Sequence, residues 1–217
     1  QRYQLLHAMA IEAKARVIVT GHTATDQAET LLMRLIRGTG PLGLSGIAAR
    51  RADAIVRPLL CLTRQEVRSY AGRHRIQCLQ DPTNRDPGPL RNRVRLRVLP
   101  LLRRLNPRVD FLLSDLAEDM TALGDMVRAH AREGLVHDVD GIRIPLAQMD
   151  DWLAYRVLAA FEQLTAAPLG LSRTHVDAVA SLRETGKRVA LPRGVKATRD
   201  REGIVVSRKV PCPSKGS

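Results

Sequence analysis

The sequence is poor in several residue types, and each shortage excludes a class of protein. Aromatic residues make up only 3% of the 217 residues, so we do not expect an extended platform for stacking nucleic-acid bases. No run of about 18 apolar residues occurs, which argues against a membrane span. Cys61, Cys78 and Cys212 form no CxxC pair, which argues against a disulfide framework or a four-cysteine zinc site. We expect buried or incidental thiols in a reducing cytoplasm.

Lysine is scarce as well, whereas arginine is abundant. The chain has five lysines, thirty arginines and a formal net charge of +13. Residues 50–108 carry +11 and residues 166–217 carry +7, whereas residues 109–165 between them carry −7. Two basic blocks around an acidic segment are typical of a protein that binds a long polyanion, more than of one that binds a membrane surface.

The stretch after residue 16 combines a strand pattern, a polar turn and a helix start. Residues 17–20 are rich in β-branched side chains and predict a buried strand, which turns through His22 into a helix over residues 26–37. Asp26 and Glu29 lie near the start of that helix. Open α/β sheets place their chemistry at such points, but the same spacing suits helix capping. Local sequence leaves both interpretations open.

Three further segments of the first half carry local signals. Residues 37–46 form a glycine-rich loop, which either approaches a phosphate through backbone amides or simply makes turns. After a short predicted strand over residues 54–56, Thr63 and Glu66 have the spacing of a capping box and predict a helix start. Residues 81–89 contain three prolines and predict a stiff loop.

Residues 90–104 predict a helix studded with arginines. Pro100 should kink or break this helix near Leu99, because proline lacks the amide hydrogen that an interior position donates. The neighbouring sequence supplies almost no carboxylates to neutralise the arginines. We therefore expect them to bind an external anion.

From Pro107 onward the pattern changes, and we place a domain boundary near residues 106–109. An acidic helix with an apolar seam should follow. A hairpin that turns at Asp140 and Gly141 comes next, because Asp-Gly between apolar runs favours that turn. The remaining predicted elements are helices over about residues 148–164 and 172–184, strands over 188–191, 195–198 and 204–207, and a disordered tail from residue 211.

Six segments in order carry a family resemblance. They are Arg2-Tyr3, Gly21-His22-x-x-x-Asp26-Gln27-Ala28-Glu29-Thr30, Arg37-Gly38-Thr39-Gly40, Arg57-Pro58-Leu59-Leu60 with Thr63-Arg64-x-Glu66, Asp81-Pro82-Thr83-Asn84-Arg85-Asp86 with Arg91-Asn92-Arg93-x-Arg95, and Gly186-Lys187-Arg188-Val189-Ala190-Leu191-Pro192. Together they resemble the tRNA(Ile)-lysidine synthetases, which are members of the N-type ATP pyrophosphatase (PP-loop) group.

The resemblance implies an α/β protein in two parts. Residues 1–107 would be the carboxy-terminal part of a doubly wound, Rossmann-like ATP pyrophosphatase domain. Residues 108–210 would be a smaller, mainly helical α+β domain that binds tRNA, and residues 211–217 a disordered tail. The implied reaction uses ATP and Mg²⁺: the wobble cytidine of a CAU-anticodon tRNA(Ile) is adenylated, and L-lysine then displaces AMP to give lysidine.

Residue roles follow from matching positions and from the chemistry that the reaction needs. Carboxylates suit a lysine ammonium, and cationic groups suit phosphates. The candidate catalytic residues are His22, Asp26 and Glu29, with Asp26 also a candidate metal ligand; the candidate ATP-binding residues are Arg2, Arg37, Gly38 and Gly40; the candidate tRNA contacts are Arg57, Arg64, Arg91, Asn92, Arg93 and Arg95. A homodimer stays open, and no membrane partner is expected.

Three departures from the family pattern matter. The family's Ser-Gly-Gly-x-Asp-Ser loop is nowhere in the sequence, and the residues that follow Gln1 have the pattern of the middle of a helix. We therefore expect an amino-terminal part of the parent protein to be missing and the isolated chain to be inactive. Thr23 and Thr25 stand where the family commonly has His and Asp. The chain also stops where some relatives continue into a further domain.

Other functions stay open beside this one. A related tRNA-thiolating enzyme would usually need a catalytic cysteine pair or an iron–sulfur CxxC, and the cysteines fit neither pattern. The chain could instead be a tRNA-binding fragment without turnover. A general DNA-binding module fits less well, because neither a helix-turn-helix nor a zinc-ligand spacing is present.

Overall fold

A computed structural model describes residues 2–51, 53–79, 83, 86–166 and 171–208. The chain forms two compact units, Gln1–Gly124 and Asp125–Ser217, which are described separately below. The division falls inside the long helix α6 (Val109–Arg132), so this helix contributes residues to both units. The domain boundary that we placed at residue 107 precedes this helix and stays a prediction.

The first unit contains a parallel pair of short strands, β1 (Ile18–Val19) and β2 (Ile55–Val56). Both predicted strands are confirmed, and they pair with each other, Ile18 with Ile55 and Val19 with Val56. The expectation that the first strand is buried was wrong, because Val19 is 65% exposed. With one neighbouring strand among the described residues, only part of β1 is covered.

Helix α2 (Ala24–Ile36) begins directly after β1 and is the centre of the first unit. Thr23 is its N-cap and forms a capping box with Asp26. Every residue from Ala24 to Glu29 is buried, so the polar side chains in the first two turns lie inside the unit. Ala28 packs with Val94 and Leu99 of the arginine-rich helix in a small apolar core.

The arginine-rich helix continues past Pro100 instead of breaking there. It consists of α4 (Leu90–Arg93), a π-helical turn (Val94–Val98) and α5 (Leu99–Leu105), with Pro100 in the first turn of α5. The amide of Leu99 donates to the carbonyl of Val94, five residues back. The wider turn accommodates the missing amide and bulky ring of proline, which is the physical reason why a break is avoided.

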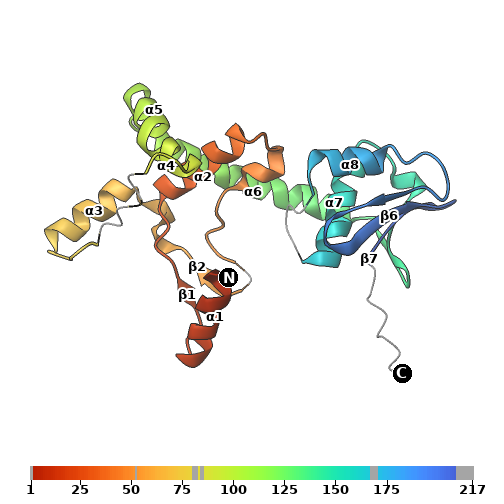
Figure 1. Cartoon of the computed structure of the whole chain (residues 1–217), viewed down its shortest axis with the longest axis horizontal. Coiled ribbons are helices and arrows are strands. Elements are labelled where there is room, and N and C mark those ends of the chain that lie inside the picture. The colour runs from red at the N-terminus through yellow and green to blue at the C-terminus, as the bar shows by residue number, and fades with distance from the viewer. Residues whose placement is uncertain (1, 52, 80–82, 84–85, 167–170, 209–217) are drawn as a thin grey trace. The chain divides into compact units, whose positions relative to one another are not determined.

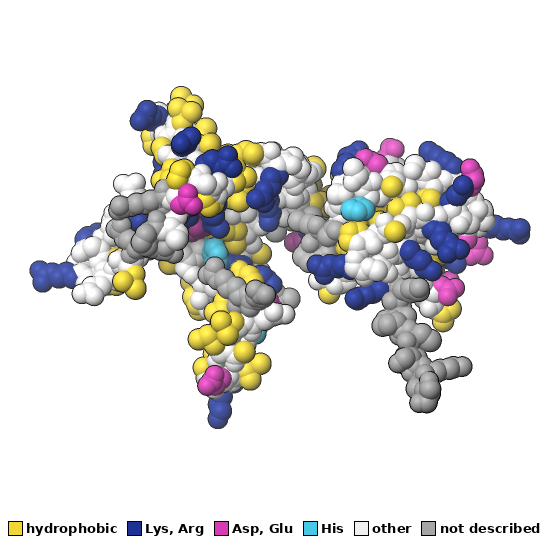
Figure 2. Space-filling view, viewed as in Figure 1, with side chains coloured by type: hydrophobic (Ala, Val, Ile, Leu, Met, Phe, Trp, Pro, Cys, Tyr) yellow, Lys and Arg dark blue, Asp and Glu magenta, His cyan; other side chains and the backbone are white. Residues whose placement is uncertain are grey.

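Two more helices belong to the first unit. Helix α3 (Arg64–Arg73) starts at the predicted capping box of Thr63 and Glu66, which is confirmed. Helix α1 (Arg2–Glu12) carries exposed apolar side chains, visible as yellow atoms near the N-terminus in Figure 2. Short 3₁₀ helices occupy Pro41–Ser45 and Pro58–Cys61. Among the described helices, none has both the length and the apolar character needed to cross a membrane.

The second unit is a five-stranded antiparallel sheet in the order β3-β4-β7-β6-β5, with two helices packed against it (Figure 1). The predicted hairpin and the three later strands are confirmed. The strands are β3 (Val136–Asp138), β4 (Gly141–Pro145), β5 (Arg188–Ala190), β6 (Val195–Arg199) and β7 (Gly203–Arg208), and the helices are α7 (Leu153–Thr165) and α8 (Arg173–Ala180).

The core of the second unit lies between the helices and one face of the sheet. Phe161 of α7 is fully buried there with Ile144 and Val206 of the central strands. At the hairpin turn Gly141 has φ +148°, and a Cβ at that position would lie 2.3 Å from the carbonyl oxygen of Val206. Glycine is therefore required for the close approach of β4 and β7. The predicted tail from residue 211 lies outside the described residues.

Candidate active site

Two carboxylates of α2, those of Asp26 and Glu29, lie among three arginine side chains. Nη2 of Arg64, at the start of α3, lies 2.9 Å from Oδ1 of Asp26. Arg91 donates to the same Asp26 oxygen at 3.0 Å and, from Nε, to Oε2 of Glu29 at 2.8 Å. Arg95 donates to both oxygens of Glu29, at 2.6 and 2.9 Å. The cluster joins α2 to α3 and to the arginine-rich helix.

Asp26 has a structural role as well as a place in this cluster. Its Oδ2 accepts hydrogen bonds from the backbone N and the Oγ1 of Thr23, at 2.9 and 2.8 Å. Burial raises the pKa of Asp26, but the bonds from Thr23 and the charges of Arg64 and Arg91 outweigh that effect and lower the pKa. The residue therefore caps α2 and stays ionised at neutral pH.

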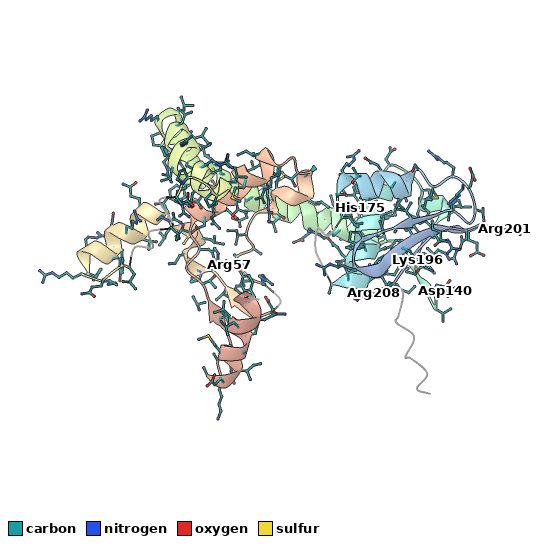
Figure 3. The ribbon with its side chains drawn as sticks, in the orientation of Figure 1. Arg57, Asp140, His175, Lys196, Arg201 and Arg208 are labelled. Atoms are coloured by element: carbon teal, nitrogen blue, oxygen red, sulfur yellow. The ribbon has the colours of Figure 1, made fainter. Side chains whose placement is uncertain are left out.

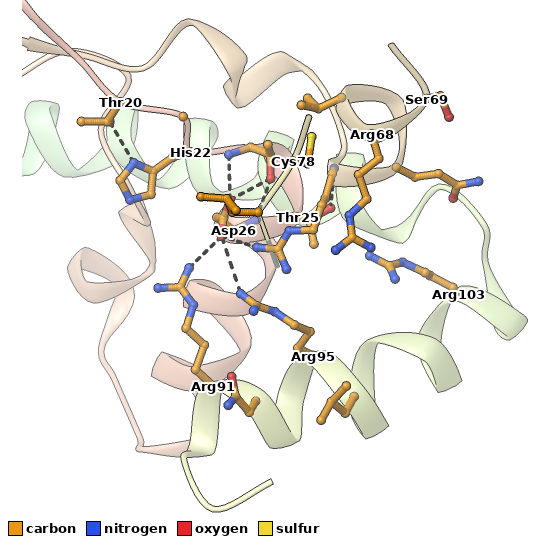
Figure 4. A pocket seen from close by; sticks show the side chains of 18 residues that line it. Thr20, His22, Thr25, Asp26, Arg68, Ser69, Cys78, Arg91, Arg95 and Arg103 are labelled. Atoms are coloured by element: carbon orange, nitrogen blue, oxygen red, sulfur yellow. Dashed lines mark hydrogen bonds and ion pairs between the residues drawn. The ribbon is translucent and has the colours of Figure 1, made fainter. Parts of the chain in front are cut away.

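A cavity of about 1290 Å³ lies beside the cluster (Figure 4). Asp26 lines this cavity, whereas Glu29 is fully buried and is not among the lining residues. The other charged or polar lining residues are Thr20, His22, Thr23, Thr25, Arg64, Gln65, Arg68, Ser69, Arg91, Asn92, Arg95 and Arg103. Arginines therefore outnumber carboxylates on the cavity wall, which makes it a suitable surface for an anion.

The expectation that the arginines of residues 90–104 have no carboxylate partners was wrong for three of them, two of which pair with α2 and one with α6. Arg91 and Arg95 pair with Asp26 and Glu29, which lie more than sixty residues earlier in the chain. The sequence around the arginines gave no sign of these partners, because the fold brings them together. By contrast, Arg93 is exposed and forms no ion pair with any residue that the structure describes.

Asn92 and Arg57, both predicted to contact tRNA, are buried side chains with intramolecular partners. Nδ2 of Asn92 donates to the carbonyls of Thr83 and Asp86, at 2.9 and 2.7 Å, and so fixes the proline-rich loop to α4. Arg57 is only 5% exposed, and its Nη2 donates to the hydroxyl of Tyr3 at 3.2 Å (Figure 3). Both contacts support the shape of the first unit, and the tRNA contacts stay predictions.

The remaining predicted residues are spread over the first unit. His22 lines the cavity, and its Nδ1 lies 2.9 Å from Oγ1 of Thr20. Arg37, Gly38 and Gly40 are exposed after α2 and do not line the cavity. Arg2 begins α1, but its side chain lies outside the described residues. The structure thus places His22 and Asp26 on the wall of one cavity, whereas the predicted ATP-binding loop does not line it.

A buried acid that sequence reasoning missed lies behind the cavity wall. Asp110, on the first turn of α6, is 3% exposed and binds Nε and Nη2 of Arg103, each at 2.7 Å. Burial raises the pKa of Asp110, but hydrogen bonds from Arg103 and Thr25 lower it overall. Oγ1 of Thr25 also accepts from the backbone N of Arg64 at 3.1 Å. The only sequence signal for Asp110 was its position at the start of a helix, where the helix dipole favours an acidic side chain.

The donor set of the cavity fits phosphate better than it fits a metal ion. Guanidinium groups bind phosphate oxygens through paired hydrogen bonds, and the cavity wall carries several of them. The carboxylate oxygens of Asp26 and Glu29 already accept bonds from arginines or Thr23. Among the described residues, no group of three or more His, Cys, Asp or Glu side chains is arranged to hold a metal. The described residues of the cavity therefore do not fit Mg²⁺.

Comparison with known proteins gives matches that cover most of the chain. Residues 1–102 match the PP-loop domain, which implies a Rossmann-like α/β ATP pyrophosphatase fold. A tRNA(Ile)-lysidine synthase of Salinispora arenicola is 38% identical over 226 residues, with 98% of this chain and 67% of that protein covered. One from a Synechococcus strain is 39% identical over 176 residues, with 77% of this chain and 54% of that protein covered. The chain thus spans about half to two thirds of the length of these relatives.

Proposed function

Because the chain belongs to the tRNA(Ile)-lysidine synthase family, we propose that its parent protein joins L-lysine to C2 of the wobble cytidine of a CAU-anticodon tRNA(Ile) in an ATP-dependent reaction. The cytidine would first be adenylated, with release of pyrophosphate. The lysine amine would then displace AMP. The observation that carries the proposal is the acid pair of α2, held by three arginines at the wall of a cationic cavity.

The two sides of that cluster suit the two kinds of ligand. Arginine forks suit the charge that develops on phosphate oxygens, and a carboxylate suits the ammonium groups of lysine. Asp26 faces the cavity and stays ionised because its pKa is lowered, so it is better placed to seat an ammonium than to accept a proton. His22 also faces the cavity and is the better candidate base.

The arginines also impose an order on ligand contact. Arg64 and Arg91 both donate to Oδ1 of Asp26. An incoming phosphate competes for these guanidinium groups and so frees the carboxylate for a cation. Glu29, fully buried under Arg91 and Arg95, holds the arginine-rich helix in place during this exchange.

The second unit supplies a further cationic surface. Lys196, Arg201 and Arg208 are exposed on or beside its sheet (Figure 3). In the proposed function this surface and the exposed Arg93 contact the tRNA backbone, because clustered cations bind its phosphates favourably. A cytoplasmic location accords with a tRNA substrate, and it stays a prediction together with the homodimer and Mg²⁺.

The decisive test is transfer of labelled L-lysine by the full-length parent protein to a CAU-anticodon tRNA(Ile) transcript in the presence of ATP and Mg²⁺. We expect label on the tRNA, and none on a matched transcript with uridine at the wobble position. Absence of lysine transfer together with ATP-dependent sulfur transfer would identify the thiolating alternative. Cys61 and Cys78 are free and exposed, so of the two expected kinds of thiol, buried or incidental, they are not the buried kind, and of these two only Cys78 lines the cavity.

The same assay on the 217-residue chain tests the alternative of an inactive tRNA-binding fragment. We expect no lysine transfer, because the sequence lacks the Ser-Gly-Gly-x-Asp-Ser loop that holds ATP phosphates in this group. Retained binding of tRNA would agree with the fragment interpretation. Turnover by this chain would show that the loop is dispensable.

A further inference from the structure

We propose that Arg68 and Arg103 form a second phosphate-binding subsite in the cavity, separate from the three arginines that hold the acid pair. Both residues line the cavity. In Figure 4 their side chains point toward one another on the side away from Arg91. The subsite itself rests on geometry and charge, and only the source of its phosphate rests on the proposed function.

Charge is unevenly neutralised along the cavity wall. Five arginines line the cavity, and four of them have carboxylate partners. The fifth is Arg68, which is exposed and forms no ion pair with any residue in the described part of the chain. A guanidinium that lines a cavity without a carboxylate partner retains its full charge for a ligand.

Arg68 and Arg103 reach the cavity from two different helices. Arg68 lies one helical turn after Arg64 on α3, so both side chains leave the same face of that helix. Arg103 reaches the cavity from α5. Two guanidinium groups that converge from different helices repel each other, and a phosphate between them removes that repulsion while it accepts hydrogen bonds from both.

A buried carboxylate holds the side chain of Arg103 in place. Asp110 binds Nε and Nη2 of Arg103, so the guanidinium plane is fixed while Nη1 is left out of that pair. The carboxylate is 3% exposed and lies on the first turn of α6, where the helix dipole stabilises its charge. Asp110 is therefore a positioning residue, which holds one wall of the subsite before a ligand arrives.

The phosphate could belong to the RNA backbone or to the nucleotide, and direct binding measurements separate the two sources. Arg68→Ala and Arg103→Ala would be compared with Arg73→Ala and Arg104→Ala. The control residues are exposed arginines on the same two helices that do not line the cavity, so the loss of charge is matched. The probes are inorganic pyrophosphate and a synthetic RNA stem-loop, each titrated against the 217-residue chain at several salt concentrations.

An RNA phosphate predicts that Arg68→Ala and Arg103→Ala each weaken stem-loop binding about tenfold. They should also reduce the slope of log affinity against log salt by about 0.7–0.9, while pyrophosphate affinity stays unchanged. A nucleotide phosphate predicts the opposite, a tenfold loss for pyrophosphate alone. Either result supports the subsite, and neither requires lysine transfer, so failure of the proposed function would be seen separately.

The subsite is refuted if both cavity variants bind both probes like their controls. Arg103→Lys provides a second check in case Arg103→Ala disturbs the packing of α5. Lysine keeps the charge but loses the fork that Asp110 fixes, so affinity for the responding probe should fall between that of the wild type and that of Arg103→Ala. Equal affinity of the Lys variant and the wild type would overturn the positioning role of Asp110.

Discussion

Replacement of Glu29 by Gln is the most direct perturbation of the acid–arginine cluster. Glu29 is fully buried and accepts three short bonds from two guanidinium groups, at 2.6, 2.8 and 2.9 Å. Gln has almost the same shape, but it removes the charge and turns an amide donor toward the arginines. Removal of one partner from a buried ion pair typically costs about 3–5 kcal/mol. Because Arg91 and Arg95 are 39% and 19% exposed and can partly turn to water, we expect the lower end, about 3 kcal/mol.

Hydrogen exchange of the α2 amides measures this loss where it acts. A decrease of about 3 kcal/mol in the free energy of opening corresponds to roughly hundredfold faster exchange. Glu118→Gln on α6 is the matched control, because Glu118 is an exposed glutamate of the same unit. We expect that variant to exchange like the wild type. Exchange of the α2 amides in Glu29→Gln within threefold of the wild-type rate would refute the reasoning that the cluster stabilises α2.

Three further predictions concern other parts of the structure. The pKa values of Asp26 and Asp110 lie below the ordinary value of 3.8, so both ionised carboxylates stabilise the fold above pH 3.8, and this stabilisation is lost as the pH falls through their lowered pKa values in the folded protein. The urea midpoint of unfolding should therefore drop in acid, and it should drop less steeply for Asp110→Asn than for the wild type. Gly141→Ala should destabilise the second unit by several kcal/mol, whereas Gly186→Ala, with positive φ but open space, should cost about 1 kcal/mol; thermal unfolding by circular dichroism compares them. Asn92→Ala should release the proline-rich loop, and faster limited proteolysis before α4 than in the wild type would show it, whereas an unchanged cleavage rate would contradict that role.

Local patterns in the sequence predicted most of the elements of the second unit. The Asp140-Gly141 turn and the strands after residue 187 depend on neighbouring residues, and both are confirmed, as is the capping box at Thr63 in the first unit. The burial of β1 could not be predicted in this way. It depends on how many strands and helices cover the strand, which is a property of the whole unit.

The sequence predicted the two carboxylates of the candidate site, but it did not predict which arginines pair with them. Asp26 and Glu29 lie on one helix three residues apart, so sequence spacing alone placed them together. Their pairing with Arg91 and Arg95 depends on the packing of α2 against α4, which local sequence does not encode. The role of Asp110 could not be predicted for the same reason, because its pairing with Arg103 depends on the contact between α5 and α6.

The π-helical turn before Pro100 also sets the direction in which later side chains point. An α-helix turns about 100° per residue, so the eight residues from Arg95 to Arg103 would leave these side chains about 80° apart. The π-helical turn contains one residue more than an α-helical turn, which removes roughly one rotation of 100° between the two positions. The directions of the Arg95 and Arg103 side chains around the helix axis then differ by only about 20°. The π-helical turn thus rotates α5 so that Arg103 lies on the same side of the helix as Arg95, the side that lines the cavity. A proline that would ordinarily interrupt a helix is here part of what aligns its arginines.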